Sequence, residues 1–283
     1  RAFYRRPTSS ASLDLSKHPS VTLLAGPTAS GKSALALKLA HQSGAVIINA
    51  DSQQLYSDLR VLTARPTVAD EAAAEHRLYG VADAGEAWSA GRGTGLYFSV
   101  LTRGLADIPP VAPAVREEAE ALYSKLGEEE FRTRLGRFDP QAAAAIERGD
   151  RQRLVRAQSV LSATGRSLSD WKAQTQPLLE PGRWEGRVIE PERARLYANC
   201  DLRVEMMLEQ GALEEVEALA ARRLDPRLPA MKAVGVRELA DFIEGRSTRE
   251  AATEALKQAT RNYAKRQLTW FRNQTADWAR TAV

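Results

Sequence analysis

One eight-residue run has the residue types and the spacing that hold a phosphate group. The run consists of Gly26, Pro27, Thr28, Ala29, Ser30, Gly31, Lys32 and Ser33. Glycines let the backbone wrap closely around an anion, so that its N–H groups point at the phosphate oxygens. The lysine supplies a positive charge, and the serine hydroxyl can ligate Mg²⁺. The run therefore predicts a site in which all eight residues surround a diphosphate or triphosphate, with Ser33 as a ligand of Mg²⁺.

A carboxylate follows the next apolar segment. Asp51 comes directly after residues 45–50, which have the pattern of a buried strand, and Ser52, Gln53 and Gln54 follow it. Ligands of a parallel sheet bind beyond the carboxyl ends of its strands, so Asp51 is expected to face the same crevice as the phosphate loop. There an acid can bind Mg²⁺ or accept a proton, and the alternative is a cap on a following helix. The neighbouring amides can bond the edge of a nucleobase.

These motifs depend on a strand, a helix and a second strand to position them. Residues 21–25 are β-branched and aliphatic, residues 32–41 have helical spacing of apolar side chains, and residues 45–50 form the second strand. A strand, helix and strand within about thirty residues is a βαβ unit, which requires a parallel sheet. We predict an α/β fold, a P-loop NTPase-like parallel sheet flanked by helices, with a mainly helical insertion domain.

The domain organisation follows from the same patterns. The predicted parts are a flexible polar leader at 1–20, a core at 21–110 and 188–283, and a helical insertion at 111–187. Within the insertion, Asp150 is a predicted N-cap for a helix from Arg151 to Ala163. Further helices are expected at 196–224 and 248–272, and a strand is expected to begin at Val188.

Composition excludes several classes of protein. No apolar run approaches twenty residues, which excludes a membrane-spanning helix, and the 43% of hydrophobic residues are enough for a core. The single cysteine, Cys200, excludes an internal disulfide framework and a zinc site with several thiolates. Without a secretory signal pattern, we expect a cytoplasmic protein, and we expect it to be a monomer.

Positive charge is concentrated at the C-terminal end. Residues 246–283 contain eight basic and three acidic side chains, and Lys257, Arg261, Lys265 and Arg272 are spaced to share one face of a helix. This stripe predicts contact with a polyanion, with Lys265 and Arg272 as candidate RNA contacts. The alternative is an ordinary solvated helix face.

Several further motifs occur in the order seen in tRNA dimethylallyltransferases, also called tRNA isopentenyltransferases, and the chain resembles that family from residue 21 onward. These motifs are Thr63–Pro66, Gly93–Tyr97, Asp150–Arg156, Leu196-Tyr197 with Arg203, Gly211 with Glu215-Val216, Val234–Arg237 and Tyr263–Arg272. The cysteine count excludes the zinc finger of eukaryotic members, so the likeness is to the bacterial-type form.

The resemblance implies transfer of a dimethylallyl group from its diphosphate to N6 of the adenosine 3′-adjacent to the anticodon of tRNA. Asp51 would be the base, Thr94 a hydroxyl near the diphosphate or the adenine, and Arg237 an arginine that reaches the diphosphate. Mg²⁺ would be the cofactor, and the tRNA anticodon arm and dimethylallyl diphosphate the partners. The predicted tRNA contacts are Asp51, Ser52, Gln53, Gln54, Thr94, Arg116, Gln152, Arg153, Leu154, Val155, Arg156, Lys265 and Arg272.

One stretch departs from the family pattern. The family has a helix and a buried strand before its Gly-Gly-Thr motif, whereas here Trp88 to Arg92 runs directly into Gly93. A core strand cannot simply be absent from a parallel sheet, so we expect that residues are missing at this point.

Two other functions stay open from the residues alone. A P-loop small-molecule kinase using ATP would need an acid after another apolar strand, and none follows Asp51. A non-catalytic RNA-binding module would bind both ligands without turnover.

Overall fold

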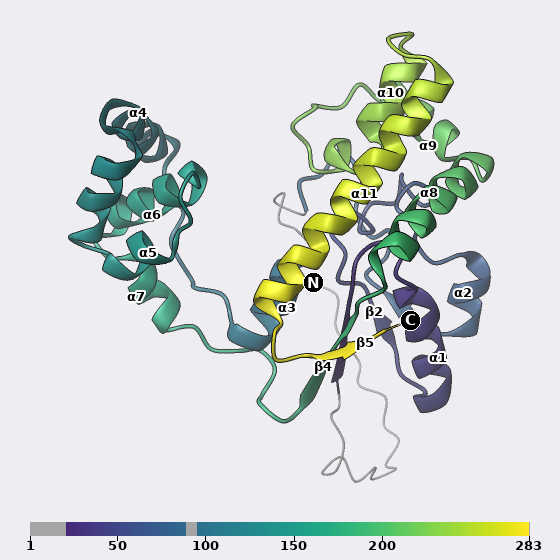
Figure 1. Cartoon of the computed structure of the whole chain (residues 1–283), viewed down its shortest axis with the longest axis horizontal. Helices are drawn as coiled ribbons and strands as arrows, with labels where there is room; N and C mark the ends of the chain where they lie inside the picture. The colour runs from purple at the N-terminus through teal and green to yellow at the C-terminus, as the bar shows by residue number, and fades with distance from the viewer. Residues whose placement is uncertain (1–20, 89–94, 283) are drawn as a thin grey trace, which may run out of the picture. The chain divides into compact units, whose positions relative to one another are not determined.

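The computed structural model describes residues 21–88 and 95–282, and the chain divides into two compact units. The first unit combines Arg1–Phe98 with Pro181–Val283, and the second is Ser99–Glu180. The first is an α/β unit in which parallel strands are flanked by helices, as predicted, and the described regular elements of the second are all helices (Figure 1). The sequence placed the insertion at 111–187, about ten residues later than this division. Among the described residues, no helix has the length and apolar character needed to cross a membrane.

Three strands form one parallel sheet in the first unit. They are β1 (Val21–Ala25), β4 (Trp184–Ile189) and β5 (Ala279–Thr281), in the order β1-β4-β5. The predicted strand at 21–25 is confirmed as β1, which pairs along its whole length with β4. A strand was expected to begin at Val188. In the structure, Val188 and Ile189 are instead the last two residues of β4, and both are buried.

A second sheet is separate from the first. It contains β2 (Ile47–Ile48) and β3 (His76–Arg77), so the strand predicted at 45–50 is shorter than expected. Helix α1 (Lys32–Ser43) contacts both β1 and β2, yet among the described residues these two strands are not hydrogen-bonded to each other. Ile48 is 63% exposed although it lies in a strand of the core. The parallel sheet is therefore divided beneath α1.

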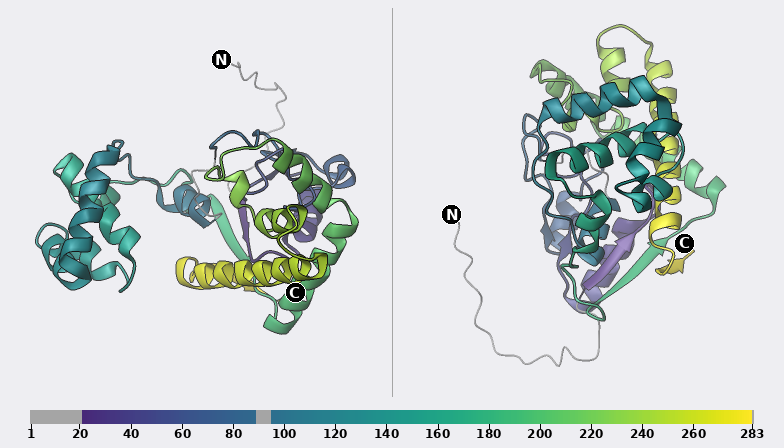
Figure 2. Two further views of the ribbon diagram at one scale, coloured as in Figure 1. Left: turned by 90° about the horizontal axis from the view of Figure 1, so that it is seen from above. Right: turned by 90° about the vertical axis from the view of Figure 1, so that its left-hand side faces the viewer.

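One core of the first unit includes Tyr56, Leu59 and Leu256. Around it pack α8 (Arg193–Glu209), α9 (Ala212–Ala221), η1 (Ala230–Lys232), α10 (Val236–Ile243) and α11 (Arg249–Gln274). The unit also contains α1, α2 (Val68–Ala73) and the start of α3 (Gly95–Arg103), which continues into the second unit. The single helix predicted at 196–224 is wrong. Gly211 has φ 102°, a left-handed conformation that ends α8 and begins α9. The helix predicted at 248–272 is confirmed as α11, which packs against α8 and α10 (Figure 2).

The second unit has a core of its own. Its helices after α3 are α4 (Pro113–Gly136), α5 (Pro140–Ala145), α6 (Arg151–Thr164) and α7 (Leu168–Ala173). The prediction for α6 is confirmed at its start, where the Asp150 side chain accepts a hydrogen bond from the Arg153 N–H. Phe131, Leu135 and Leu154 are at most 1% exposed and join α4 to α6.

Candidate active site

The predicted phosphate loop connects β1 to α1 and has the backbone that wraps an anion. Gly26, Ala29 and Gly31 have φ of 152°, 59° and 86°, and α1 begins at Lys32. A side chain at Gly26 would clash, because its Cβ would lie 2.8 Å from the Ile189 carbonyl oxygen. The loop therefore turns tightly against β4 and directs the N-terminus of a helix at its own concave side, which favours a bound anion.

Two helices distant in sequence hold this loop. The side chain of Gln267, on α11, accepts a hydrogen bond from the Thr28 N–H at 2.7 Å, and Asn199, on α8, donates to the Ala29 carbonyl at 3.4 Å. The Lys32 Nζ donates to the Pro27 carbonyl at 2.7 Å. The Ser30 hydroxyl is buried without a hydrogen-bond partner among the described residues. A phosphate oxygen would supply the acceptor that this hydroxyl lacks.

Lys32 lies in a group of interacting charges. The pKa of its ammonium falls from 10.5 to about 8, because burial and, as a smaller effect, the nearby Arg203 guanidinium lower it by more than the Asp51 carboxylate raises it. Asp51 therefore lies close enough to the phosphate loop to act on its lysine. The expected proximity of this carboxylate to the anion site is thus present in the fold.

Asp51 is fixed by its neighbours rather than by a helix. Its Oδ1 accepts a hydrogen bond from the Gln53 N–H at 3.0 Å, which closes a turn, and the next described helix begins only at Val68. The alternative that Asp51 caps a helix is therefore wrong. The buried side chain of Asn49 accepts from the Asp51 N–H at 2.7 Å and donates to the carbonyls of Asp51 and Leu78, both at 2.9 Å.

A tyrosine also lies within electrostatic range of the Asp51 carboxylate. Burial, followed by the charge of Asp51, raises the pKa of Tyr79 to about 12. Tyr79 therefore keeps its phenolic proton at neutral pH. Asn49 and Tyr79 were not predicted as site residues, and only their closeness to the strand ends in sequence pointed to them.

Arg203, on α8, is the arginine that the structure brings to this group of charges. Its Nη2 donates to the Thr63 carbonyl at 3.3 Å, and its buried Nε has no hydrogen-bond partner among the described residues. Burial lowers its pKa, whereas Asp51 raises it. The sequence pointed to Arg203 only as part of a motif, because its distance from Lys32 along the chain hid their proximity.

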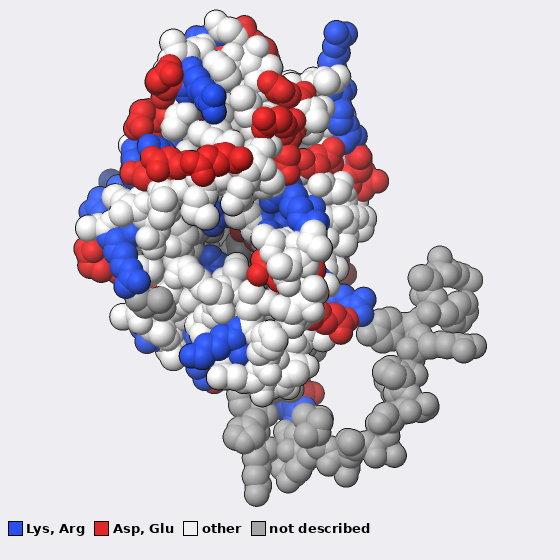
Figure 3. All heavy atoms as spheres, turned by 90° about the vertical axis from the view of Figure 1, so that its right-hand side faces the viewer, with Lys and Arg blue, Asp and Glu red and all other residues white. Residues whose placement is uncertain are grey.

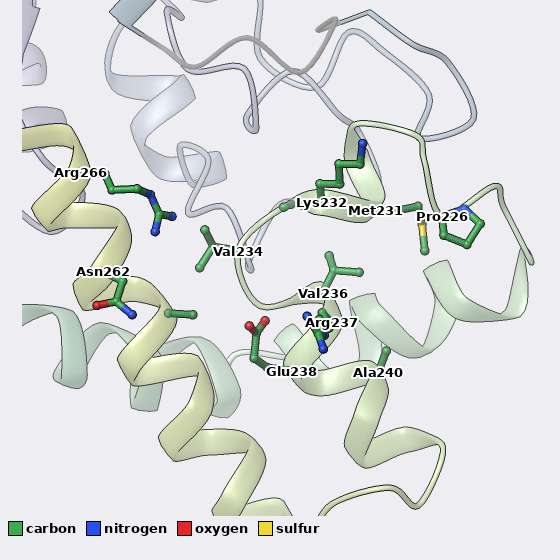
Figure 4. A pocket seen from close by; sticks show the side chains of 12 residues that line it. Pro226, Met231, Lys232, Val234, Val236, Arg237, Glu238, Ala240, Asn262 and Arg266 are labelled. Carbon is green, nitrogen blue, oxygen red and sulfur yellow. The ribbon is translucent and has the colours of Figure 1, made fainter. Parts of the chain in front are cut away.

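Arg237, the arginine predicted to reach the diphosphate, lines a pocket of the first unit. It is an exposed residue of α10, and the pocket, of about 600 Å³, lies between η1, α10 and α11 (Figure 4). Lys232, Arg266, Glu238 and Asn262 line the same pocket. Its lining combines the cations Lys232, Arg237 and Arg266 with apolar side chains that include Val234 and Val236. The predicted role of Arg237 stays a prediction.

The polar residues after Asp51 already hold backbone groups. Gln54 donates to the carbonyls of Thr63 and Ala64 at 2.9 and 2.8 Å, and Gln53 accepts from the Val234 N–H at 3.3 Å. Ser52 is 9% exposed. Tyr56, which also has a group able to bond a nucleobase, is a core residue with 1% exposure. Thr94 lies outside the described residues.

The basic stripe of α11 is largely paired within the protein. Lys257 pairs with Glu205 at 2.9 Å, Arg261 with Asp201 at 2.5 Å and Arg272 with Glu190 at 2.6 Å, whereas Lys265 is exposed. Acidic and basic side chains are interspersed over one face of the molecule, which is hollowed near its middle where Lys or Arg atoms are visible (Figure 3). The C-terminal excess of positive charge is therefore less available than its sequence suggests.

The remaining predicted contacts lie in the second unit. Arg116 pairs with Glu120 at 3.0 Å and Arg153 with Asp150 at 3.2 Å, both at the surface. Gln152 and Arg156 are exposed beside Arg153 on α6. Leu154 and Val155 are buried, with exposures of 0% and 3%, so their side chains serve packing.

Comparisons with known proteins place the chain in a family. A family model described as IPP transferase matches residues 93–274, and one described as Isopentenyl transferase matches residues 19–83. A tRNA dimethylallyltransferase of Caulobacter sp. is 52% identical over 92% of this chain and 92% of its own, and one of Phenylobacterium zucineum is 52% identical over 93% and 92%.

Solved structures agree with these matches. The full-length tRNA isopentenylpyrophosphate transferase of Bacillus halodurans is 29% identical, with a TM-score of 0.64 over 94% of this chain and 90% of that one. A eukaryotic dimethylallyltransferase acting on tRNA has the same fold, with a TM-score of 0.74 at 22% identity over 93% of this chain and 73% of that one.

The alignment also bears on the missing strand. The alignment with the Caulobacter protein is 283 positions long. It includes 92% of the 283 residues of this chain, which is about 260 residues. At about 23 positions, therefore, the Caulobacter protein has a residue and this chain has none. The two family models leave only residues 84–92 between them, where the expected strand is absent from the sequence. With a family model over more than half its length and close relatives over nine tenths of it, the chain belongs to the IPP transferase family, that of the tRNA dimethylallyltransferases.

Proposed function

We propose that the protein transfers a dimethylallyl group from dimethylallyl diphosphate to N6 of the adenosine 3′-adjacent to the anticodon of tRNA. The observation that carries this proposal is the group formed by Lys32, Asp51 and Arg203, in which two cations of an anion site lie within electrostatic range of a carboxylate. An allylic transfer needs both a site for the leaving diphosphate and a base for the incoming amine. Membership of the family supports the same reaction.

The phosphate loop and the two cations act on the leaving group. As the C1–O bond of the substrate breaks, negative charge develops on the diphosphate, and the loop amides, Lys32 and Arg203 stabilise it. A guanidinium binds such an anion through two parallel N–H groups, and the unpaired Nε of Arg203 is one of those available. These groups are fixed before the substrate binds, so little reorganisation is needed during the reaction.

Asp51 acts on the nucleophile. The exocyclic N6 of adenine forms a bond to C1 of the dimethylallyl group and loses one proton, which the carboxylate accepts. Asn49 and the Gln53 N–H fix the backbone and one oxygen of Asp51, which leaves the other oxygen to face the substrate. Because an adenine in an anticodon loop is stacked, it must be turned out of the loop to reach this group.

The donor set fits Mg²⁺. Magnesium is held in such sites by one or two protein oxygens together with substrate phosphates and water, and Ser33 offers an exposed hydroxyl at the first turn of α1. No cluster of three or more acidic, histidine or cysteine side chains suited to a metal occurs in the described residues, which agrees with a metal held mainly by the substrate. We propose Ser33 as its protein ligand; when bound, the ion would neutralise charge on the diphosphate.

The experiment that tests this function uses labelled substrates. The protein is incubated with radiolabelled dimethylallyl diphosphate or γ-labelled ATP, with and without tRNA. Label transferred from dimethylallyl diphosphate into tRNA, and mapped to the adenosine next to the anticodon, is the expected result. Phosphoryl transfer from ATP to a small molecule would instead show a kinase, and binding of both ligands without turnover would show an RNA-binding module.

A further inference from the structure

Glu215, on α9, makes a contact that the reaction described above does not use. Its two carboxylate oxygens accept hydrogen bonds from the N–H groups of Val61 and Leu62, at 2.7 and 2.9 Å. These two amides are consecutive and lie more than 150 residues earlier in the chain. An ionised carboxylate can accept both bonds at once, and hydrogen bonds to a charged acceptor are stronger than neutral ones.

The segment that Glu215 holds, residues 59–65, is compact and partly strained. Leu59 and Leu62 are 0% and 4% exposed, and the Thr63 hydroxyl donates to the Leu59 carbonyl at 2.5 Å. Ala64 has φ 48°, a left-handed conformation that costs free energy in a residue other than glycine. Such a backbone persists only where its surroundings fix it, and the Glu215 carboxylate is one of those surroundings.

The same segment presents one carbonyl to the active site. The Thr63 oxygen accepts from the Gln54 side chain at 2.9 Å and from the Arg203 Nη2 at 3.3 Å. Among the described residues, it is the hydrogen-bond acceptor found for Arg203. The direction of this guanidinium therefore depends on where segment 59–65 places the Thr63 carbonyl.

Helices α8 and α9 bring both contacts to one segment. Arg203 lies on α8 and Glu215 on α9, and the two helices are joined by the turn at Gly211. Glu215 fixes the segment from one helix, and Arg203 uses the fixed carbonyl from the other. We infer that Glu215 is a positioning residue that holds Arg203 toward the diphosphate through the Thr63 carbonyl.

This inference rests on the proposed role of Arg203 in binding the diphosphate. Its test replaces Glu215 by Gln, which keeps the size of the side chain but presents an N–H₂ group to one of the two amides. The matched control is Glu217→Gln, an exposed glutamate one half-turn further along α9. The measurements are the KM for dimethylallyl diphosphate, kcat, and the midpoint of thermal unfolding.

For Glu215→Gln we expect the KM for dimethylallyl diphosphate to rise about tenfold, because this is the effect of losing a hydrogen bond to a charged group. The KM for tRNA should change less than twofold. The KM does not depend on the fraction of folded enzyme, so it separates positioning from stability. Glu217→Gln should leave both constants unchanged. A lower unfolding midpoint with an unchanged KM would mean a purely structural role and would overturn the inference.

A double mutant separates this inference from the proposed function. Arg203→Met alone should raise the KM for dimethylallyl diphosphate, and adding Glu215→Gln should then raise it less than twofold further, because both changes affect one interaction. If Arg203→Met leaves the KM unchanged, the proposed role of Arg203 fails and the inference fails with it. If the two changes multiply independently, Arg203 keeps its role, and Glu215 does not act through it.

Discussion

Burial changes the pKa of individual side chains near the predicted diphosphate site. Lys32, the first residue of α1, is partly buried beside Arg203. Burial and this guanidinium favour the neutral amine by more than Asp51 favours the ammonium, so the pKa of Lys32 falls to about 8. Below that pH the ammonium binds the anion, and above it the amine does not. A bound diphosphate reverses the effect, because a nearby anion favours the ammonium.

We therefore expect kcat/KM for dimethylallyl diphosphate to fall as pH rises through about 8. The corresponding limb of kcat, which reports the substrate complex, should lie at higher pH. Rate measurements from pH 6.5 to 9.5 test this expectation. Lys38→Met, a change at an exposed lysine of the same helix, should leave the profile unaltered. A flat kcat/KM across this range would show that Lys32 does not titrate in the site.

Single residues also show what a sequence can predict. The phosphate loop and Asp51 could be proposed from sequence, because each closely follows a strand along the chain and its chemistry is local. Arg203 and Gln267 could not be assigned individually, because only the packing of α8 and α11 brings them to the loop. Burial likewise separates Leu154 and Val155 from the exposed residues of the same motif.

At the scale of elements, the divided sheet is the unusual feature of the first unit. The strands β1 and β2 lie under one helix, which is about 10 Å wide, whereas neighbouring strands lie about 4.8 Å apart. A strand added between them would have edges to pair with, because among the described residues the two are not hydrogen-bonded to each other. Val46 and Ile48, exposed at 43% and 63%, are the side chains that such a strand would help to cover.

The relatives carry about 23 aligned positions that this chain lacks. We expect these positions to fall at the junction after Trp88, where the sequence lacks the expected strand. Inserting the Caulobacter residues there should then raise the midpoint of thermal unfolding by about 5 °C or more, because an added buried strand covers apolar side chains and pairs with strand edges. A glycine-serine insert of equal length is the control. Equal midpoints for the two inserts would show that the sheet does not need the segment.

The elements themselves were predicted where a local signal exists. Asp150 caps α6 as expected, because its side chain accepts a bond from the first turn, and Thr248, predicted as the first residue of its helix, caps α11 in the same way. The break between α8 and α9 was missed because the apolar spacing continues across Gly211, whose left-handed backbone ends the first helix. The order of the strands could not be derived from periodicity, since it depends on pairing between distant segments.

At the scale of the whole molecule, charge pairing decides which basic residues are available for RNA. On α11 the guanidinium of Arg261 is bound to Asp201, whereas Arg156 of the second unit is exposed. Replacing an arginine that contacts a phosphate lowers the dependence of binding on salt. Replacing an arginine that is already paired with an acidic side chain should change this salt dependence less.

We expect Arg156→Met to reduce the slope of log affinity for tRNA against log salt concentration by about 0.7. Arg261→Met, the matched change in the first unit, should reduce it by less than half as much. Binding titrations between 50 and 200 mM salt give both slopes. An equal reduction by both variants would show that the internal ion pairs open when tRNA binds.

The most direct test concerns the shared site of Asp51 and the phosphate loop. For Asp51→Ala we predict that transfer to tRNA falls by about 10²–10⁴-fold, while the dissociation constant for dimethylallyl diphosphate, measured by calorimetry, stays within threefold. That result requires a carboxylate that serves the adenine beside an intact anion site. Wild-type turnover in this variant would contradict the proposed role of Asp51.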